Sequence, residues 1–156
     1  MKRKRLSKSE KRDLSNSLEY FGFDLYLKKE KLEKVKLEDI ILFYDLDSKR
    51  VICFKRDGIL YPSIHTINSF DESMKKVEVD KGAVKPISNG ANLMVPGIKN
   101  FDVFKKGEVV KIMYQDTPIA IGESLMSSED LDQNDNGVGI NSIHHIKDDI
   151  WDFSLD

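Results

Sequence analysis

The chain has 156 residues, of which 40% are hydrophobic and 33% are charged. This composition is typical of a soluble protein that folds as one medium domain or two small ones. No hydrophobic run approaches the length needed to span a membrane, and the single cysteine excludes an internal disulfide bond. Residues 1–6 are basic and lack the apolar stretch of a signal peptide, so we expect a cytoplasmic protein without membrane contacts.

The net charge of −2 conceals an uneven distribution along the chain. Residues 1–36 contain 12 Lys or Arg against 6 Asp or Glu, a net charge of +6, which leaves −8 for residues 37–156. A basic region on an acidic body can orient a protein towards phosphate. Lysines kept for solubility explain the same pattern, and charge alone favours that explanation.

The N-terminal residues predict a capped helix. Ser7 and Glu10 have the spacing of a capping box, in which the side chain of each accepts from the backbone amide of the other. Leu14 and Leu18 then lie on one apolar stripe, and Gly22 can end the helix.

The segment that follows predicts a small sheet. Residues 28–36 are mostly lysine and glutamate, which leaves a helix and a charged connector as alternatives. The expected strands are residues 40–44, 51–54 and 59–61, the last two joined by a tight turn at Asp57 and Gly58. Pro62 suits the first turn of a helix with Ile64, Ile67 and Phe70 on its inner side.

A polar break at residues 71–76 predicts the boundary between two domains, residues 1–74 and residues 75–156. Beyond it the expected β-type runs are residues 93–95, 109–114, 119–122 and 139–146. A short helix begins after the capping residue Ser127. Several short strands and two small helices within about 75 residues indicate a closed or nearly closed β-barrel.

Residues 79–98, with the sequence VDKGAVKPISNGANLMVPGI, predict a binding surface. A basic helical turn leads to a small-residue turn and then to a buried strand closed by Pro-Gly. Glycine and alanine remove side-chain bulk, so another backbone can approach closely. Lys81 and Lys85 share one helical face and can span adjacent phosphates, and we expect backbone amides at the helix start and in the glycine turn to donate to phosphate oxygens.

Three segments resemble a known family. They are Tyr61-Pro62-Ser63, residues 79–98, and residues 137–151 with the sequence GVGINSIHHIKDDIW. In this order they resemble PUA-domain proteins of the malignant-T-cell-amplified-sequence family, including its archaeal relatives. The resemblance covers most of residues 58–151, and residues 1–57 match only in position and approximate length. It implies an α+β fold, with a small N-terminal pre-PUA α+β domain followed by a PUA-type β pseudo-barrel with short helices.

The resemblance also implies an RNA-binding, translation-associated function. Its expected ligands are the acceptor end of tRNA or small-subunit ribosomal RNA, bound in initiation or ribosome recycling. Its expected partners are the small ribosomal subunit and a density-regulated-protein-like chain. The turn at residues 88–91 takes the family's role of approaching structured RNA. The candidate RNA-binding residues are Lys81, Gly82, Lys85, Ser88, Asn89, Gly90, Ala91, Asn92 and Gly97.

Alternatives to this function remain open at the level of the sequence. The glycines can serve tight turns only, and Asn92 can cap a local backbone group. Residues 81–156 carry 7 basic against 12 acidic side chains, a low balance for an RNA surface, so the basic N-terminal region is expected to supply further phosphate contacts. A protein-binding adaptor and an accessory specificity module for an RNA-modifying enzyme are the competing functions.

Candidate catalytic chemistry is sparse. The sequence contains no Ser-His-Asp order, zinc pattern, Walker motif or dinucleotide fingerprint, so we expect no enzyme activity, metal or cofactor. His144 and His145 are adjacent in an expected strand and must face opposite sides, one towards the core and the other towards solvent or RNA. Trp151 at a strand end is more typical of a core residue than of a base-stacking platform.

Overall fold

The computed structural model describes residues 1–23, 31–69 and 74–155, and it divides into two compact units. The first unit comprises Met1–Ser73 and Asp149–Asp156, and the second comprises Met74–Asp148. The end of the chain therefore groups with the first unit, whereas the predicted second domain, residues 75–156, includes it.

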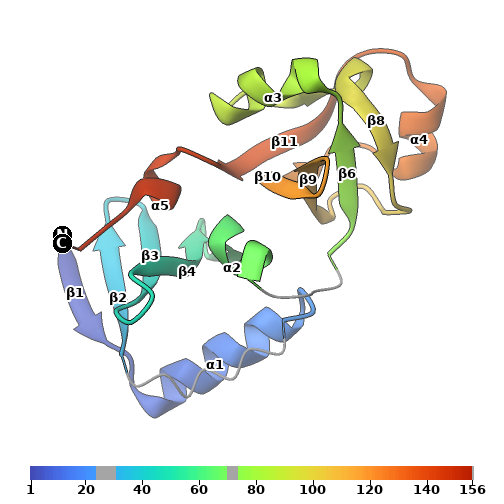
Figure 1. The fold of residues 1–156 in the computed structure, drawn as a ribbon. Coiled ribbons are helices and arrows are strands. Elements are labelled where there is room, and N and C mark those ends of the chain that lie inside the picture. Colours follow the sequence, from blue (N-terminus) through green and yellow to red (C-terminus); the bar gives the residue numbers. More distant parts are fainter. Residues whose placement is uncertain (24–30, 70–73, 156) are drawn as a thin grey trace. The chain divides into compact units, whose positions relative to one another are not determined.

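The first unit is built on a five-stranded sheet in the order β1-β2-β3-β4-β5, in which every neighbouring pair is antiparallel (Figure 1). Its strands are β1 (Lys2–Arg5), β2 (Leu32–Leu37), β3 (Ile40–Asp45), β4 (Arg50–Arg56) and β5 (Ile59–Pro62). Its helices are α1 (Lys8–Glu19), α2 (Ile64–Ser69) and α5 (Asp149–Asp152). The three predicted strands are confirmed as β3, β4 and β5.

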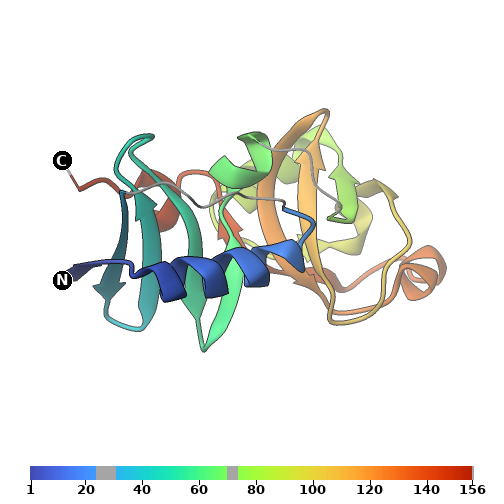
Figure 2. The same cartoon turned by 90° about the horizontal axis from the view of Figure 1, so that it is seen from below.

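Helix α1 begins as the sequence predicts. The Glu10 amide donates to Ser7 Oγ, and the Ser7 amide donates to Glu10 Oε1, each over 3.1 Å, so the capping box is complete. Leu14 and Leu18 are buried on its inner stripe, and the helix runs across the strands of the sheet (Figure 2). Gly22 has a φ of 82°, the left-handed conformation that commonly follows a helix end.

Strand β2 corrects the prediction for residues 28–36. Neither a helix nor a connector forms over Leu32–Leu37, which is a strand between β1 and β3, and residues 28–30 lie outside the described residues. Leu32 and Val35 are both fully buried although they point to opposite faces of the sheet. A strand covered on both faces loses the alternation that identifies strands, and the spacing of these two residues imitates a helix.

The predicted role of Pro62 is also wrong. Pro62 is the last residue of β5, and α2 begins at Ile64. Ser63 supplies the cap instead, because its hydroxyl accepts from the Thr66 amide over 3.2 Å. Ile64 and Ile67 are buried as expected, and Phe70 lies outside the described part of the chain.

The aromatic residues near the C-terminus pack within the first unit. The Trp151 ring stacks on the His65 ring with centroids 3.9 Å apart, and His65 Nε2 donates to the Trp151 carbonyl oxygen over 3.1 Å. Phe153 meets the buried Tyr44 edge to face. Cys53 is buried as well, and burial raises the pKa of its thiol, which keeps it protonated and unreactive.

The second unit is built on a curled six-stranded sheet in the order β7-β11-β10-β9-β6-β8, in which only β6 and β9 run parallel (Figure 1). Its strands are β6 (Lys76–Val79), β7 (Leu93–Met94), β8 (Ile98–Phe101), β9 (Val109–Tyr114), β10 (Thr117–Ser124) and β11 (Val138–His145). Its helices are α3 (Lys81–Ser88), the 3-10 turn η1 (Val95–Gly97) and α4 (Ser128–Gln133). The four predicted β-type runs are confirmed as β7, β9, β10 and β11, whereas β6 and β8 were not predicted.

The core of the second unit gathers apolar side chains from all six strands and from α3 and α4. The start of α4 is capped as expected, because Ser127 Oγ accepts from the Asp130 amide. None of the helices within the described ranges is long and apolar enough to cross a membrane. Within the same ranges, no three His, Cys, Asp or Glu side chains are grouped so that they can hold a metal ion.

Candidate nucleic-acid interface

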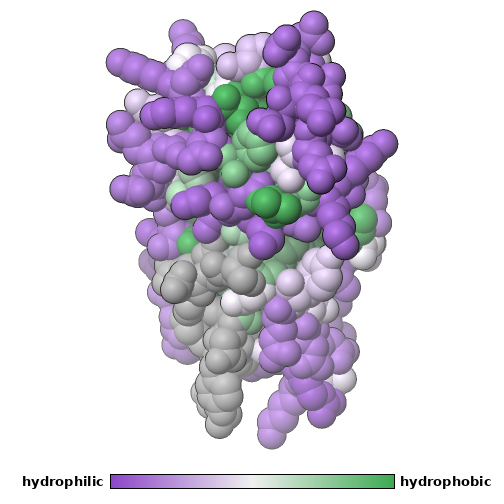
Figure 3. All heavy atoms as spheres, turned by 90° about the vertical axis from the view of Figure 1, so that its right-hand side faces the viewer, coloured by the Kyte–Doolittle hydropathy of each residue, from purple (hydrophilic) through white to green (hydrophobic). Residues whose placement is uncertain are grey.

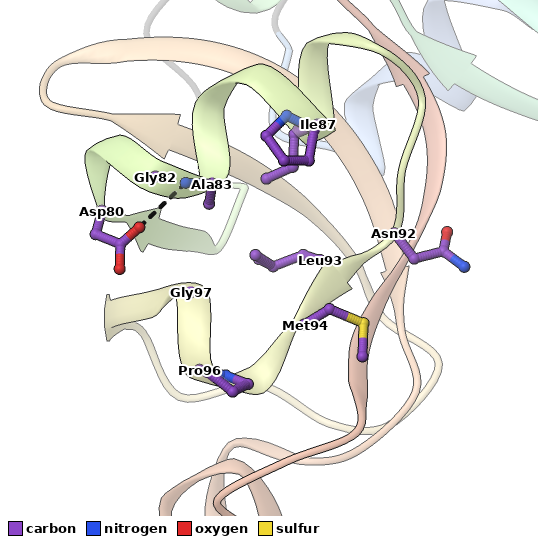
Figure 4. Close-up of a pocket in the computed structure, with 10 residues that line it drawn as sticks. Asp80, Gly82, Ala83, Ile87, Asn92, Leu93, Met94, Pro96 and Gly97 are labelled. Atoms are coloured by element: carbon purple, nitrogen blue, oxygen red, sulfur yellow. Dashed lines mark hydrogen bonds between the residues drawn. The ribbon is translucent and has the colours of Figure 1, made fainter.

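A pocket of about 300 Å³ opens in the second unit between α3 and the segment formed by β7 and η1 (Figure 4). Its lining is mainly apolar, and Ala83 and Leu93 point into the space between the two segments. The lining residues are Asp80, Gly82, Ala83, Pro86, Ile87, Asn92, Leu93, Met94, Pro96 and Gly97. Gly82, Asn92 and Gly97 are thus the predicted site residues that the pocket brings together.

The pocket keeps its shape because the start of α3 is fixed to η1. The Asp80 amide donates to the Gly97 carbonyl oxygen over 3.1 Å, and Asp80 Oδ1 accepts from the Ala83 amide over 3.1 Å. A Cβ atom on Gly97 would lie 3.2 Å from the Ala83 Cβ. Glycine at position 97 therefore permits the close approach of these two segments, which is a role in the fold.

The predicted cations lie on α3 beside the pocket. Lys81 and Lys85 are both exposed and stand four residues apart, so they share one side of the helix. Helical periodicity adds the half-buried Ser88 to the same row, next to the row of Gly82 and Pro86 that lines the pocket. We call Lys81, Lys85 and Ser88 the α3 stripe.

The expectation that backbone amides of this segment donate to phosphate is wrong for four of them. At the helix start, the Ala83 amide is already used by the carboxylate of the capping Asp80. At the helix end, the amides of Asn89, Gly90 and Ala91 donate to carbonyl oxygens of α3 itself. The capping carboxylate and the internally bonded turn therefore remove these four amides from the groups that can bind a phosphate here.

The turn at residues 89–91 is nevertheless open to a ligand. Gly90 and Ala91 are exposed, as is the helix-capping Asn89. Asn92 Oδ1 accepts from the Ser142 amide of β11 over 2.8 Å, so it holds the turn against a strand that is fifty positions away in the chain. Asn92 therefore caps a backbone group, as the alternative interpretation proposes, but this group is distant in sequence and not local.

The two adjacent histidines face opposite sides of β11, as predicted. His144 is fully buried, and its Nδ1 lies 2.7 Å from Asp148 Oδ2, which also accepts from the His145 amide. His145 is half-buried, and its Nδ1 donates to the Ile146 carbonyl oxygen over 2.8 Å. Its Nε2 lies next to Gly90, which adds His145 to the border of the site. Sequence alternation predicted that one of the two histidines faces outward, but it identified neither which one nor its neighbour.

Much of the surface of the second unit is hydrophilic. On the face drawn in Figure 3, hydrophobic atoms in the upper part of the view form small areas between hydrophilic side chains. The exposed Met94 at the rim of the pocket is one of the large apolar side chains that solvent can reach.

The comparison with known proteins places these residues in a family. The family model for the PUA domain matches residues 75–146, which include the pocket, the α3 stripe and His145. Translation machinery-associated protein 20 of Saccharomyces cerevisiae is 34% identical over 85% of this chain and 78% of its own length. The chain belongs to the family of PUA-domain proteins that contains this relative.

Two further members support the assignment over the length of both units. The malignant T-cell-amplified sequence 1 homolog of Dictyostelium discoideum is 30% identical over 82% of this chain and 74% of its own length. The solved structure of a conserved PUA-domain protein from Thermoplasma acidophilum superimposes with a TM-score of 0.82, at 26% identity, over 94% of this chain and 95% of the other. The family and the α+β fold expected from the motifs are confirmed.

Proposed function

We propose that this PUA-domain protein binds structured RNA that ends in, or contains, an unpaired segment, and that it does so as a factor of the translation machinery. The observation that carries the proposal is the position of the exposed α3 stripe beside a mainly apolar pocket. Relatives over most of the chain are named for association with the translation machinery, which supports the cellular setting.

The two parts of the site suit two parts of a nucleotide. Unpaired bases present flat apolar faces, which Leu93, Met94 and Pro96 can contact inside a pocket of this size. Lys81 and Lys85 then neutralise the phosphates on either side. The carboxylate of Asp80 at the pocket edge disfavours a phosphate inside it, so base or ribose is the group that enters.

The polar side chains around the turn add discrimination. Ser88 of the α3 stripe and the adjacent Asn89 carry donors and acceptors, and 2′-hydroxyl groups are the feature by which proteins distinguish RNA from DNA. The acceptor end of tRNA, with its single-stranded 3′ terminus, and exposed loops of small-subunit ribosomal RNA both offer such nucleotides. We propose these as the ligands, with initiation or recycling as the step and a density-regulated-protein-like chain as a partner.

The test compares two pairs of lysines by fluorescence anisotropy with a labelled RNA hairpin. The hairpin carries a single-stranded 3′ end, and a blunt version serves as the reference ligand. Lys81→Glu/Lys85→Glu should weaken binding at least tenfold and reduce the slope of log affinity against log salt by about 2. Lys105→Glu/Lys106→Glu changes the charge equally at an exposed turn of the same unit and should have a smaller effect.

Equal losses in both variants would contradict the proposed site. Met94→Asp addresses the pocket separately, because it places a carboxylate at an exposed rim position. We expect it to abolish the preference for the single-stranded end over the blunt end. Binding of a protein partner together with no measurable RNA affinity would favour the adaptor function instead.

A further inference from the structure

The register between β1 and β2 places lysines directly opposite one another on the edge of the first unit's sheet. Lys2 pairs with Lys36, and Lys4 pairs with Lys34. Directly opposed side chains of an antiparallel pair have Cβ atoms roughly 5 Å apart and point to the same face. Two like-charged pairs are therefore stacked along one face of the strand pair.

A fifth lysine extends this face towards the middle of the sheet. Lys36 pairs with Ile41 of β3, and Ile41 pairs with Lys55 of β4, so Lys55 lies in the same row. We call Lys2, Lys4, Lys34, Lys36 and Lys55 the lysine face. Lys2, Lys4, Lys36 and Lys55 are exposed, and Lys34 is half-buried.

Among the described residues, few acidic side chains pair with the lysine face. Lys34 Nζ lies 3.1 Å from Glu10 Oε2, and Asp13 of the same helix lines the groove beside Lys34 and Lys55. Across the part of the chain that the structure describes, the other four lysines make no ion pair. The opposite face of β1 differs, because Arg3 binds Glu33 through two nitrogens, with the shorter contact at 2.7 Å.

Protection of an exposed sheet edge explains only part of this arrangement. Lysines on an edge strand prevent another chain from pairing with it, and β1 is such an edge. Lys36 lies on β2 and Lys55 lies on β4, and both of these strands are paired on both sides. These two positions gain nothing from edge protection, and at Lys36 the directly opposed Lys2 costs stability.

We propose that the lysine face binds the sugar-phosphate backbone of RNA, as a second contact surface in addition to the pocket and α3 stripe. Alternate residues along a strand are spaced about 6.6 Å apart, and neighbouring strands about 4.8 Å apart. This grid is comparable to the separation of successive phosphates along one strand. Lysine provides point charges without base recognition, so this surface adds affinity but no sequence preference.

The inference takes its ligand class from the proposed function, but it concerns different residues. It also accounts for the charge balance, because residues 81–156 carry a net charge of −5 whereas residues 1–36 carry +6. The unit that contains the pocket, Met74–Asp148, has 9 Lys or Arg against 11 Asp or Glu, a net charge of −2, so it has no excess of positive charge with which to hold a long phosphate backbone by itself. The lysine face supplies that attraction from the first unit.

The decisive variant is Lys4→Gln/Lys36→Gln in the full chain, tested with tRNA and with a small-subunit RNA fragment over a salt series. We expect a loss of threefold to tenfold in affinity at low salt and a slope reduced by roughly 1.5. The melting temperature should stay equal or rise, because each substitution removes one member of an opposed lysine pair. With an equal or higher melting temperature, a loss of affinity cannot result from unfolding of the variant.

The matched control is Lys8→Gln/Arg12→Gln, which removes two exposed charges from the side of α1 that faces away from Leu14 and Leu18. It should weaken binding less than Lys4→Gln/Lys36→Gln does. Equal effects of the two variants would overturn the inference, because net charge alone would then explain the loss. Acetylation of Lys36, followed by mass spectrometry, should decrease when tRNA is added, and unchanged acetylation would likewise overturn it.

The two proposals fail separately. If Lys4→Gln/Lys36→Gln binds RNA like the unmodified protein while Lys81→Glu/Lys85→Glu does not, the lysine face has no role and the proposed function stands. If only the lysine-face variant is weakened, the inference holds and the α3 stripe does not bind the RNA. An acidic protein that binds the lysine face while RNA affinity stays unchanged would also overturn the inference.

Discussion

The imidazole of His145 lies directly beside Gly90. A Cβ atom added at position 90 would come within 3.2 Å of His145 Nε2, and Gly90 itself has a φ of 93°. Two constraints therefore select glycine here, one from the backbone and one from a strand end far away in sequence. The turn that approaches RNA in the proposed function is also a turn that the fold needs.

Gly90→Ala should accordingly destabilise the second unit. A left-handed conformation costs an L-residue about 1–2 kcal/mol, and the contact with His145 adds to this. Calorimetric unfolding of the single variants and of Gly90→Ala/His145→Ala separates the backbone cost from the cost of the contact. The double variant keeps the strained backbone of alanine at position 90 but removes its contact with the His145 ring. An unchanged unfolding temperature in Gly90→Ala would contradict the assigned geometry. Because Gly90→Ala destabilises the unit, a loss of RNA binding in this variant does not by itself show that Gly90 contacts RNA.

Gly82 offers the cleaner probe of close approach. An added Cβ would meet only Asp80 Oδ1, at an ordinary distance of 3.5 Å, and the residue is exposed on the first turn of α3. Gly82→Leu should keep or slightly raise stability, because leucine favours a helix over glycine by up to about 1 kcal/mol. Its side chain would cover the pocket, so we expect RNA affinity to fall several-fold in anisotropy measurements.

The control for Gly82→Leu is Lys99→Leu, which adds the same side chain at an exposed position of β8 and also removes one charge. If Gly82→Leu binds RNA as tightly as the unmodified protein while remaining folded, no RNA lies over this part of α3. The proposed pocket would then be wrong even if Lys81 and Lys85 still contribute charge.

Local signals predicted most of the strands and the N-terminal caps of α1 and α4. Capping residues such as Ser7 and Ser127 bond to amides within three positions, so their role is fixed by neighbours in the chain. Tight turns such as Asp57-Gly58 depend on the conformation of two residues, which have φ values of 53° and 77°. For such features, all of the interacting residues lie within a few positions of one another in the sequence.

The features that were missed depend on distant segments. Strand β2 is apolar on both faces because other elements cover both sides of it, and neither neighbour is visible in a window around Leu32. The amide expectation failed at Ala83 because Asp80 was not recognised as an N-cap, although aspartate is a favoured capping residue. The lysine face required the register of four strands, which no spacing in the sequence provides.

Glu10 predicts a pH dependence of the first unit. The hydrogen bond from the Ser7 amide and the bond from Lys34 hold the pKa of the Glu10 carboxyl below its ordinary value. Because the folded-state pKa is lowered, this contribution to stability is present at neutral pH and is lost as the pH falls through the acidic range below about 4. Glu10→Gln, which keeps the capping box without the charge, should show less of this loss.

Urea unfolding followed by tryptophan fluorescence measures this effect, because the single tryptophan, Trp151, belongs to the first unit. The difference in stability between the unmodified protein and Glu10→Gln should shrink from pH 7 to pH 3. Glu19→Gln at the other end of α1 serves as the charge-matched control. A difference that stays constant over this range would exclude Glu10 as the titrating group.

Asn92 allows its two roles to be separated. Asn92→Ala leaves the half-buried Ser142 amide without its acceptor, which should cost about 1–3 kcal/mol and release the turn from β11. Asn92→Asp keeps an acceptor oxygen. Hydrogen exchange of the Ser142 amide should therefore remain slow in the Asn92→Asp variant and become fast in the Asn92→Ala variant. The new carboxylate should still weaken RNA binding if phosphates pass the turn, and unchanged affinity in the Asp variant would show that they do not.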